Sequence, residues 1–370
     1  VFFAIRPYSR RAAIVATFAM AIHPQAARLV GYLLSETFGL FLCSVLVFTF
    51  SRIEQGYRGF INYLLFGVVL IALPLTSPAT IVLSVAIGGY VLYKLLIKRL
   101  PMHAVVMVIG VSSLLIPWQV HCINSTGSVC STLYSSNVIQ RLDNSPNVIY
   151  YWFRTWAHGE KDLPVIWRSD VKAIPERAFR SEEEKIYILE AISEKNTQTN
   201  STGHILLNES ADKFVAQNRF LFYVGLPMIR SFNLWFDMMQ IDHVQMEYVG
   251  RFFSKKIIED YVEVGPIHTF QRILKSFVST FVYLIYISYP VFLLVITCYG
   301  LIKKEAIIIL IGSSILAYTL ISGFVAHGES RRNVVFLPAI LYLLRFVPTA
   351  RTCQMPLHSP VAVAASSRGQ

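Results

Sequence analysis

The stretch LVGYLLSETFGLFLCSVLVFTF, residues 29–50, is an apolar run long enough to cross a lipid bilayer as one helix. Its only acidic or basic side chain is that of Glu36. An ionised group near the bilayer centre costs about 2.5 kcal/mol or more, so Glu36 has to face another helix or a cavity. Small residues at four-residue spacing favour close contact with a neighbouring helix, and such a stripe recurs here: Gly31, Ser35, Gly39 and Cys43.

Similar apolar runs recur along the whole chain. The 370 residues are 54% hydrophobic and only 15% charged, which is more apolar than a soluble core of this size requires. Together with the run at 29–50, seven further segments predict about eight membrane crossings: 12–23, 60–75, 78–97, 103–118, 276–302, 306–324 and 334–348. We therefore expect an all-α, multi-pass integral membrane protein.

Lysine and arginine are distributed unevenly between the expected connections. One side of the membrane has three basic residues in its short turns, Arg28, Arg331 and Arg332. The other side has twelve: Arg6, Arg10, Arg11, Arg52, Arg58, Lys94, Lys98, Arg99, Lys303, Lys304, Arg345 and Arg351. The positive-inside rule makes the second side cytoplasmic and the long segment 119–275 exoplasmic. That segment has seventeen basic and eighteen acidic residues, so the net charge of +11 reflects the cytoplasmic turns and does not predict nucleic-acid binding.

These segments divide the chain into four parts. We expect an N-terminal transmembrane block of about five helices over 1–118 and an exoplasmic domain over 119–275. A C-terminal block of about three helices over 276–348 and a disordered cytoplasmic tail over 349–370 follow. The opening residues 1–11 resemble the end of a helix and a cytoplasmic turn, which predicts an N-terminally truncated chain.

Two helical stretches are expected within the exoplasmic segment. Ser181 and Glu184 form a capping box at the start of a helix over 181–195. The apolar and aromatic stretch 214–236 is interrupted by Pro227, and we expect it to lie along the membrane interface without spanning the bilayer.

Aromatic and sulfur side chains of this segment have open interpretations. All five tryptophans lie between Trp118 and Trp235, a placement that predicts either an interfacial aromatic belt or stacking on a sugar ring. The five cysteines of the chain lack metal-ligand spacing. Cys122 and Cys130 fall in the exoplasmic segment, where an oxidising compartment permits a disulfide, and the sequence leaves their pairing open.

A second stretch, ISGFVAHGESRRNVVFL at 321–337, places polar side chains between two apolar runs: His327, Glu329, Arg331 and Arg332. Arginine is disfavoured in exoplasmic turns, and a guanidinium near lipid donates two parallel hydrogen bonds to a phosphate. We therefore expect Arg331, helped by Arg332, to bind the phosphate of a lipid-borne substrate. The alternative is a solvated pair directed towards lipid headgroups.

Two further candidates lie near the first helix. Glu36 is expected either to hydrogen-bond between helices or to line a substrate cavity shared with His23, for which His327 and Glu329 are further candidates. His23, in the turn His23-Pro24, is on the same side and is either a helix-end residue or a neighbour of Glu36. A metal cluster of His23, Glu36 and His327 has no supporting spacing, so no divalent metal is expected.

Four stretches occur in an order that is known from one superfamily: HPQAARLVGYLLSETFGLFL at 23–42, GVVLIALPLTSP at 67–78, IPWQVHCINSTG at 116–127 and HGESRRNVVFLP at 327–338. Together they resemble the GT-C-fold glycosyltransferases that use polyprenyl-phosphate sugars, which include protein mannosyltransferases and aminoarabinose transferases. Arg331 matches the arginine of that family, whereas Ser77 stands where the family has a basic residue.

The resemblance implies a GT-C-like helical bundle that transfers a sugar, with inversion, from a polyprenyl-phosphate donor to a glycan, lipid or protein acceptor. The expected location is a bacterial inner membrane with an exoplasmic active face. In that family a carboxylate acts as the general base and cations stabilise the departing phosphate. The catalytic acidic loop precedes the stretches matched here, so no catalytic residue is assigned. The alternatives are a lipid-linked-sugar transporter or flippase and a catalytically inactive membrane scaffold.

Overall fold

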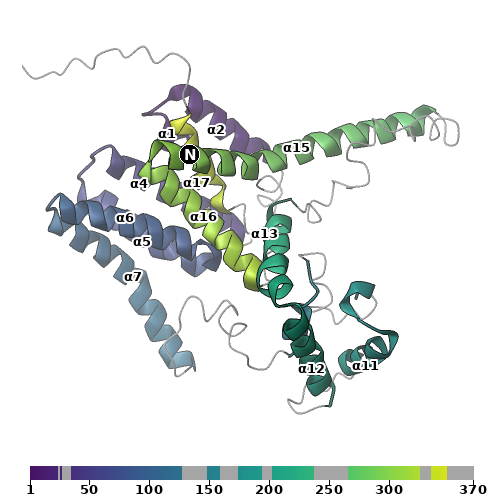
Figure 1. Cartoon of the computed structure of the whole chain (residues 1–370). Coiled ribbons are helices and arrows are strands. Elements are labelled where there is room, and N and C mark those ends of the chain that lie inside the picture. Colours follow the sequence, from purple (N-terminus) through teal and green to yellow (C-terminus); the bar gives the residue numbers. More distant parts are fainter. Residues whose placement is uncertain are drawn as a thin grey trace, which may run out of the picture.

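The structure is a computed structural model that describes residues 1–23, 26, 35–126, 148–158, 174–193, 202–236, 266–325 and 335–347 (Figure 1). About 88% of these residues are helical, and no strand occurs among them, which confirms the all-α prediction. Four of the described helices are long and apolar enough to cross a membrane: Glu36–Glu54, Pro78–Ile97, Pro101–Ser125 and Thr269–Lys303. The chain therefore has the helices of a membrane protein.

The N-terminal block begins with two short helices and continues with four longer ones. They are α1 (Phe2–Ile5), α2 (Arg10–Ile22), α4 (Ser35–Glu54), α5 (Phe60–Thr76), α6 (Ile81–Ile97) and α7 (Pro101–Thr126). The start of α2 is capped by the Ser9 hydroxyl, which accepts a hydrogen bond from the Ala12 N–H at 3.2 Å. Helix α7 continues eight residues past the expected domain boundary at 118, because the polar residues after Trp118 still form helical turns.

The closest contact in this block is between α5 and α7. A Cβ atom on Gly67 would overlap the carbonyl oxygen of Met107, and one on Gly110 would overlap the carbonyl oxygen of Leu64. Both glycines therefore let the two helix backbones meet without an intervening side chain. Close packing at small residues is common between membrane helices, and here it occurs although the glycines do not form a regular stripe in the sequence.

The C-terminal block contains α15 (Pro266–Lys303), α16 (Ala306–Val325), α17 (Leu337–Tyr342) and the 3₁₀ turn η9 (Leu343–Phe346). At 38 residues, α15 is about 57 Å long, which exceeds the roughly 30 Å apolar thickness of a bilayer. In Figure 1 its first half extends away from the other helices. Helix α17 is buried along its whole length and is much shorter than the crossing expected over 334–348.

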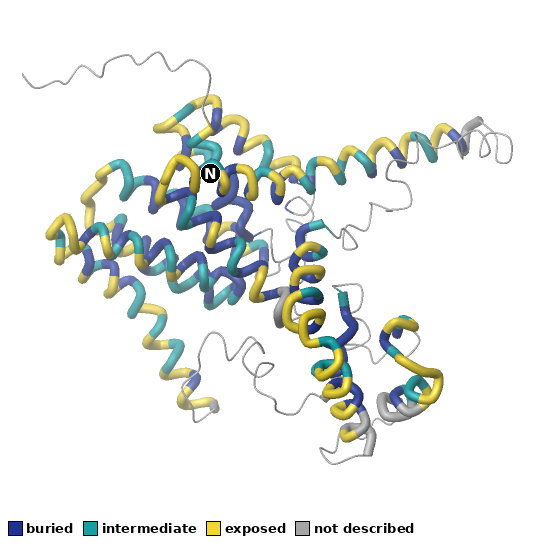
Figure 2. Tube along the Cα trace, viewed as in Figure 1, coloured by how far each residue is buried: buried dark blue, intermediate teal, exposed yellow. Residues whose placement is uncertain are grey.

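The described residues between the two blocks form a second, smaller core that is separate from that of the bundle. Their helices are α9 (Val148–Phe153), the 3₁₀ turn η4 (Glu176–Ala178), α11 (Glu182–Ser193), α12 (Thr202–Gln217), the π-helical turn η5 (Leu221–Gly225) and α13 (Leu226–Phe236). The small core gathers Trp152, Phe153, Trp156, Ile188 and Leu207, all at most 4% exposed. In Figure 2, buried and exposed stretches alternate along α12, one of the helices of this core.

Three of the four described tryptophans occupy protein cores. Trp152 is 1%, Trp156 4% and Trp235 8% exposed. Side chains with so little exposed surface neither form an interfacial belt nor offer a ring face to a sugar. For these three residues both interpretations drawn from the sequence are wrong, because Trp152 and Trp156 build the small core and Trp235 packs into the core of the bundle.

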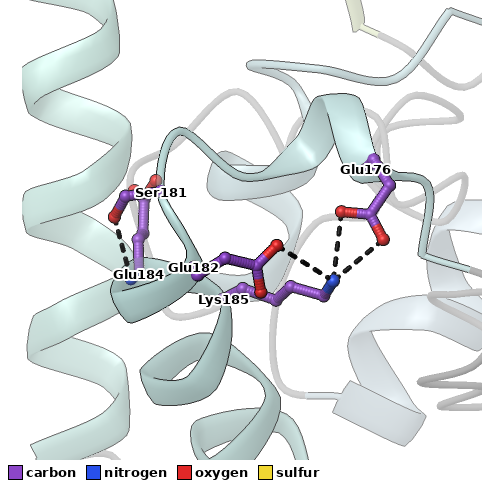
Figure 3. Close-up of polar contacts among 5 residues, drawn as sticks. All are labelled: Glu176, Ser181, Glu182, Glu184 and Lys185. Atoms are coloured by element: carbon purple, nitrogen blue, oxygen red, sulfur yellow. Dashed lines mark hydrogen bonds and ion pairs between the residues drawn. The ribbon is translucent and has the colours of Figure 1, made fainter.

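Helix α11 begins where the capping box predicts. The Ser181 hydroxyl accepts a hydrogen bond from the Glu184 N–H at 3.1 Å (Figure 3). The Glu184 carboxylate accepts from the Arg180 N–H at 2.7 Å, one residue before the expected partner. In Figure 3, Lys185 Nζ reaches Glu176 Oε1 at 2.9 Å and Glu182 at 3.5 Å, an exposed ion-pair group of small energetic weight.

Helices α9 and α12 are joined by a hydrogen bond at the edge of the small core. The Tyr151 hydroxyl donates to Asp212 Oδ1 at 2.9 Å. Partial burial, together with this bond, raises the pKa of Tyr151 to about 12, so the phenol stays protonated throughout the physiological range.

Candidate functional site

Three of the four stretches that resemble the glycosyltransferase motifs meet at Gly39 of α4. A Cβ atom on Gly39 would lie 3.2 Å from Val335 Cγ1 and 3.5 Å from Ser77 Cβ. Gly39 belongs to the stretch at 23–42, Ser77 to that at 67–78 and Val335 to that at 327–338. Segments separated by up to 296 residues in sequence (335 − 39) are therefore packed against one another within the described part of the bundle.

Ser77 has a structural role at this contact. It caps the end of α5 through its N–H, which donates to the Leu73 carbonyl at 2.8 Å, and its own carbonyl accepts from the Thr80 hydroxyl at 2.8 Å. The side chain is 6% exposed. A long basic side chain at this position would not fit the space between α4 and Val335 without displacing one of them.

One turn further along α4, Cys43 continues the same packing face. It is fully buried, and its sulfur faces the backbone of Ala339 in α17, which is also fully buried. Thus the described end of the small-residue stripe, Gly39 and Cys43, faces the residues that follow 334. Gly31 and the Ser35 side chain lie outside the described residues.

His23 closes the end of α2 and is 4% exposed. Its Nδ1 accepts a hydrogen bond from the Ala26 N–H at 3.3 Å, three residues on, as an N-cap side chain does. Since Nδ1 acts as the acceptor, the neutral ring carries its proton on Nε2. This geometry supports the helix-end role of His23, and leaves Nε2–H as the group with which it could contact a substrate.

Two tyrosines of α15 enclose the His23 ring. The ring centroid of Tyr289 lies 4.5 Å away in an edge-to-face arrangement, and that of Tyr286 lies 6.1 Å away. Neither tyrosine was predicted from the sequence. Their spacing of three positions, just before Pro290 within the helix, places them on one face, but the sequence alone does not show which residue that face meets.

Glu36 lies in the first described turn of α4 and is 7% exposed. It precedes Gly39 by three positions, so the two residues lie on the same side of the helix. The carboxylate is therefore on the side of α4 where Ser77 and Val335 pack. This burial agrees with the expectation that Glu36 avoids lipid, and both of its expected roles, packing and cavity lining, stay open.

The remaining predicted site residues, His327, Glu329, Arg331 and Arg332, lie outside the described residues. The same holds for Cys130, so its pairing with Cys122 stays a prediction. Among the residues that the structure describes, no group of three or more histidine, cysteine or acidic side chains is placed to hold a metal ion.

Comparisons with known proteins add no relative. No protein-family model matches the chain, and no curated protein and no solved structure is significantly similar to it.

Proposed function

We propose that this chain is a membrane glycosyltransferase of GT-C-like architecture, which moves a sugar from a polyprenyl-phosphate donor to a glycan, lipid or protein acceptor on the exoplasmic face. The observation that supports the proposal most directly is the contact of Gly39 with Ser77 and Val335. Stretches that resemble the motifs of one enzyme family form one site only if the fold brings them together, and three of the four do meet.

The residues have distinct proposed roles. Arg331, with Arg332 beside it, binds the donor phosphate, because a guanidinium stays charged near lipid and donates two parallel hydrogen bonds. Glu36 and His23 line the acceptor side of the cavity, where the Nε2–H of His23 is the available donor. His327 and Glu329 complete the polar lining. The general base is not assigned to a residue of this chain.

The test is transfer of a radiolabelled sugar by the full-length protein in lipid nanodiscs. A polyprenyl-phosphate sugar is supplied with a pool of membrane glycolipid and peptide acceptors, and the release of polyprenyl phosphate is measured together with labelled product. We expect stoichiometric release and transfer. A donor that stays intact with every acceptor class would contradict the proposal.

The same preparation separates the two alternatives. In sealed vesicles, a transporter or flippase moves the intact lipid-linked sugar to the opposite leaflet, where an impermeant periodate reagent detects it, and releases no polyprenyl phosphate. An inactive scaffold produces neither movement nor release. Each of the three functions therefore has its own combination of results.

A further inference from the structure

The segment formed by η5 and α13 has an outer face that contains no charge. Counted from Phe220, the residue before η5, its exposed side chains are all apolar or aromatic: Phe220, Leu221, Tyr223, Val224, Met228, Ile229 and Phe232. Phe220 is 76% and Phe232 60% exposed, and Figure 2 marks this side of the segment as exposed. The exposed Arg219 immediately precedes this face. Between Arg219 and Phe236 the only other charged residue is Arg230.

Arg230 points away from this face and is 5% exposed. Its Nε–H donates to the Ala157 carbonyl at 2.8 Å, and a terminal N–H donates to the Arg154 carbonyl at 2.5 Å. The Asn233 amide likewise donates to the His158 carbonyl at 2.9 Å. Arg230 and Asn233 are thus directed at the segment that forms the small core, whereas the exposed apolar side chains lie on the outer face.

A second set of hydrogen bonds fixes α13 to α16. The indole N–H of Trp235 donates to the Thr319 hydroxyl at 2.8 Å, and the Ser231 hydroxyl donates to the Thr319 carbonyl at 3.1 Å. All three residues are at most 8% exposed. Figure 1 shows α13 beside the far end of α16.

The position of Thr319 along α16 sets the depth of this contact. Helix α16 is an apolar helix of 20 residues that begins at Ala306, and only Glu305 separates it from the basic pair Lys303 and Lys304. Thirteen residues separate Ala306 from Thr319 (319 − 306), a rise of about 20 Å, whereas the apolar layer of a bilayer is about 30 Å thick. If α16 starts at the cytoplasmic surface, Thr319 and its partners on α13 lie inside the apolar layer.

We propose that the outer face of η5 and α13 is inserted into the bilayer and contacts lipid acyl chains, about 10 Å below the exoplasmic surface at its deepest point. This is deeper than the interfacial position expected from the sequence. The exposed Leu320 and Ile321 of α16 continue the same charge-free surface next to Thr319, which favours lipid over a protein partner. Burying the face in hydrocarbon removes its apolar area from water at about 25 cal/mol per Å².

The test uses the full-length chain, with its five cysteines replaced, in phosphatidylcholine–phosphatidylglycerol nanodiscs. A single nitroxide label is placed at residue 228 or 232, with residue 320 as the lipid-facing reference and the exposed Glu209 of α12 as the aqueous reference. We expect dissolved oxygen to enhance the relaxation of the labels at 228 and 232 more than a water-soluble nickel chelate does, as it does for the label at 320. The label at 209 should show the reverse, with the larger enhancement from the nickel chelate. Nickel accessibility at 232 equal to that at 209 would overturn the proposal, as would dipolar broadening that reveals a second copy.

A second measurement uses the native chain, so its result does not depend on correct folding of the cysteine-free protein. Nanodiscs that contain a photoactivatable acyl chain are irradiated, and the labelled peptides are mapped by mass spectrometry. Labelling within 220–232, at a yield similar to that of α16 and without labelling of α11, supports insertion. Labelling of α16 without labelling of 220–232 contradicts it.

Discussion

The hydroxyl of Tyr289 donates a hydrogen bond of 2.5 Å to the backbone carbonyl of Ala19, 270 residues earlier in the chain. In an uninterrupted helix this carbonyl would accept from the N–H of His23, which instead donates to the Met20 carbonyl at 3.4 Å. The phenol of α15 therefore satisfies a carbonyl that the end of α2 leaves open. The same tyrosine packs its ring against His23, so a single residue fixes the position of a candidate site residue.

Replacing this tyrosine tests how much the bond stabilises the fold. Tyr289→Phe keeps the ring contact with His23 and leaves the partly buried Ala19 carbonyl without its donor, so we expect a loss of about 1–3 kcal/mol. Thermal unfolding of the detergent-purified protein measures the effect, and Tyr93→Phe, at a 62% exposed position, is the matched control. Equal melting temperatures for the two variants would rule out a stabilising role for the bond.

The contact between α5 and α7 predicts that one added methyl group is poorly tolerated. Gly67→Ala places a Cβ against the Met107 carbonyl, and backbone cannot move aside as a flexible side chain can, so we expect a loss of roughly 1–3 kcal/mol. Gly89→Ala in α6 meets nothing within 4 Å and should be neutral or stabilising by up to about 1 kcal/mol. Folded yield by size-exclusion chromatography and the melting temperature give the comparison. Similar values for both would show that the helices can move apart at low cost.

Glu36 should affect activity more than folding. Glu36→Gln preserves the shape and most hydrogen-bonding capacity of the side chain but removes its charge, so we expect sugar transfer to fall at an unchanged folded yield. Glu54→Gln, near the other end of α4, removes the 3.0 Å ion pair with Lys94 and should leave the transfer per folded molecule unchanged. A parallel fall of activity and yield in Glu36→Gln would assign Glu36 to packing.

Arg331 should bind the donor phosphate as a bidentate group. Arg331→Lys keeps the charge and loses the paired hydrogen bonds, so we expect donor use to weaken about tenfold or more, and Arg332→Lys to have a smaller effect. The measurement is transfer from a purified polyprenyl-phosphate sugar at varied donor concentration. Wild-type turnover by Arg331→Ala would remove the residue from the site.

The orientation of the chain can be tested in intact cells. Single cysteines at Ser181 and Arg58, both exposed positions, are introduced into a cysteine-free background. A membrane-impermeant maleimide should label the cysteine at 181 and not the one at 58, because the arginine and lysine distribution makes 119–275 exoplasmic. Labelling at 58 alone would invert the topology and the proposed active face.

The sequence predicted most helices because the length of an apolar run determines whether it can span a bilayer. The predicted run at 60–75 corresponds to α5 (Phe60–Thr76), and Ser181 caps α11 as expected. Helix α15 begins ten residues before the predicted boundary at 276, because Arg272 and Lys275 lower the local hydropathy without breaking a helix. Hydropathy reports the environment of a segment, and not where its helix begins.

The candidate site was predictable only in part. A carboxylate in an apolar run has to be buried, and the 7% exposure of Glu36 agrees with this. The packing of Gly39 against Val335 and the enclosure of His23 by Tyr289 depend on how distant helices cross. A single sequence contains no signal for such pairs.

The hydrogen bonds of α13 also constrain the order of assembly on the ribosome. Ser231 and Trp235 are synthesised 88 and 84 residues before their partner Thr319, so at about 5–20 residues per second they wait on the order of 10 seconds for it. Arg230, in contrast, follows its partner Ala157 by 73 residues and can bind it as soon as it emerges. The nascent segment can therefore close its small core early, but α13 can be secured to the bundle only after Thr319 of α16 has been synthesised.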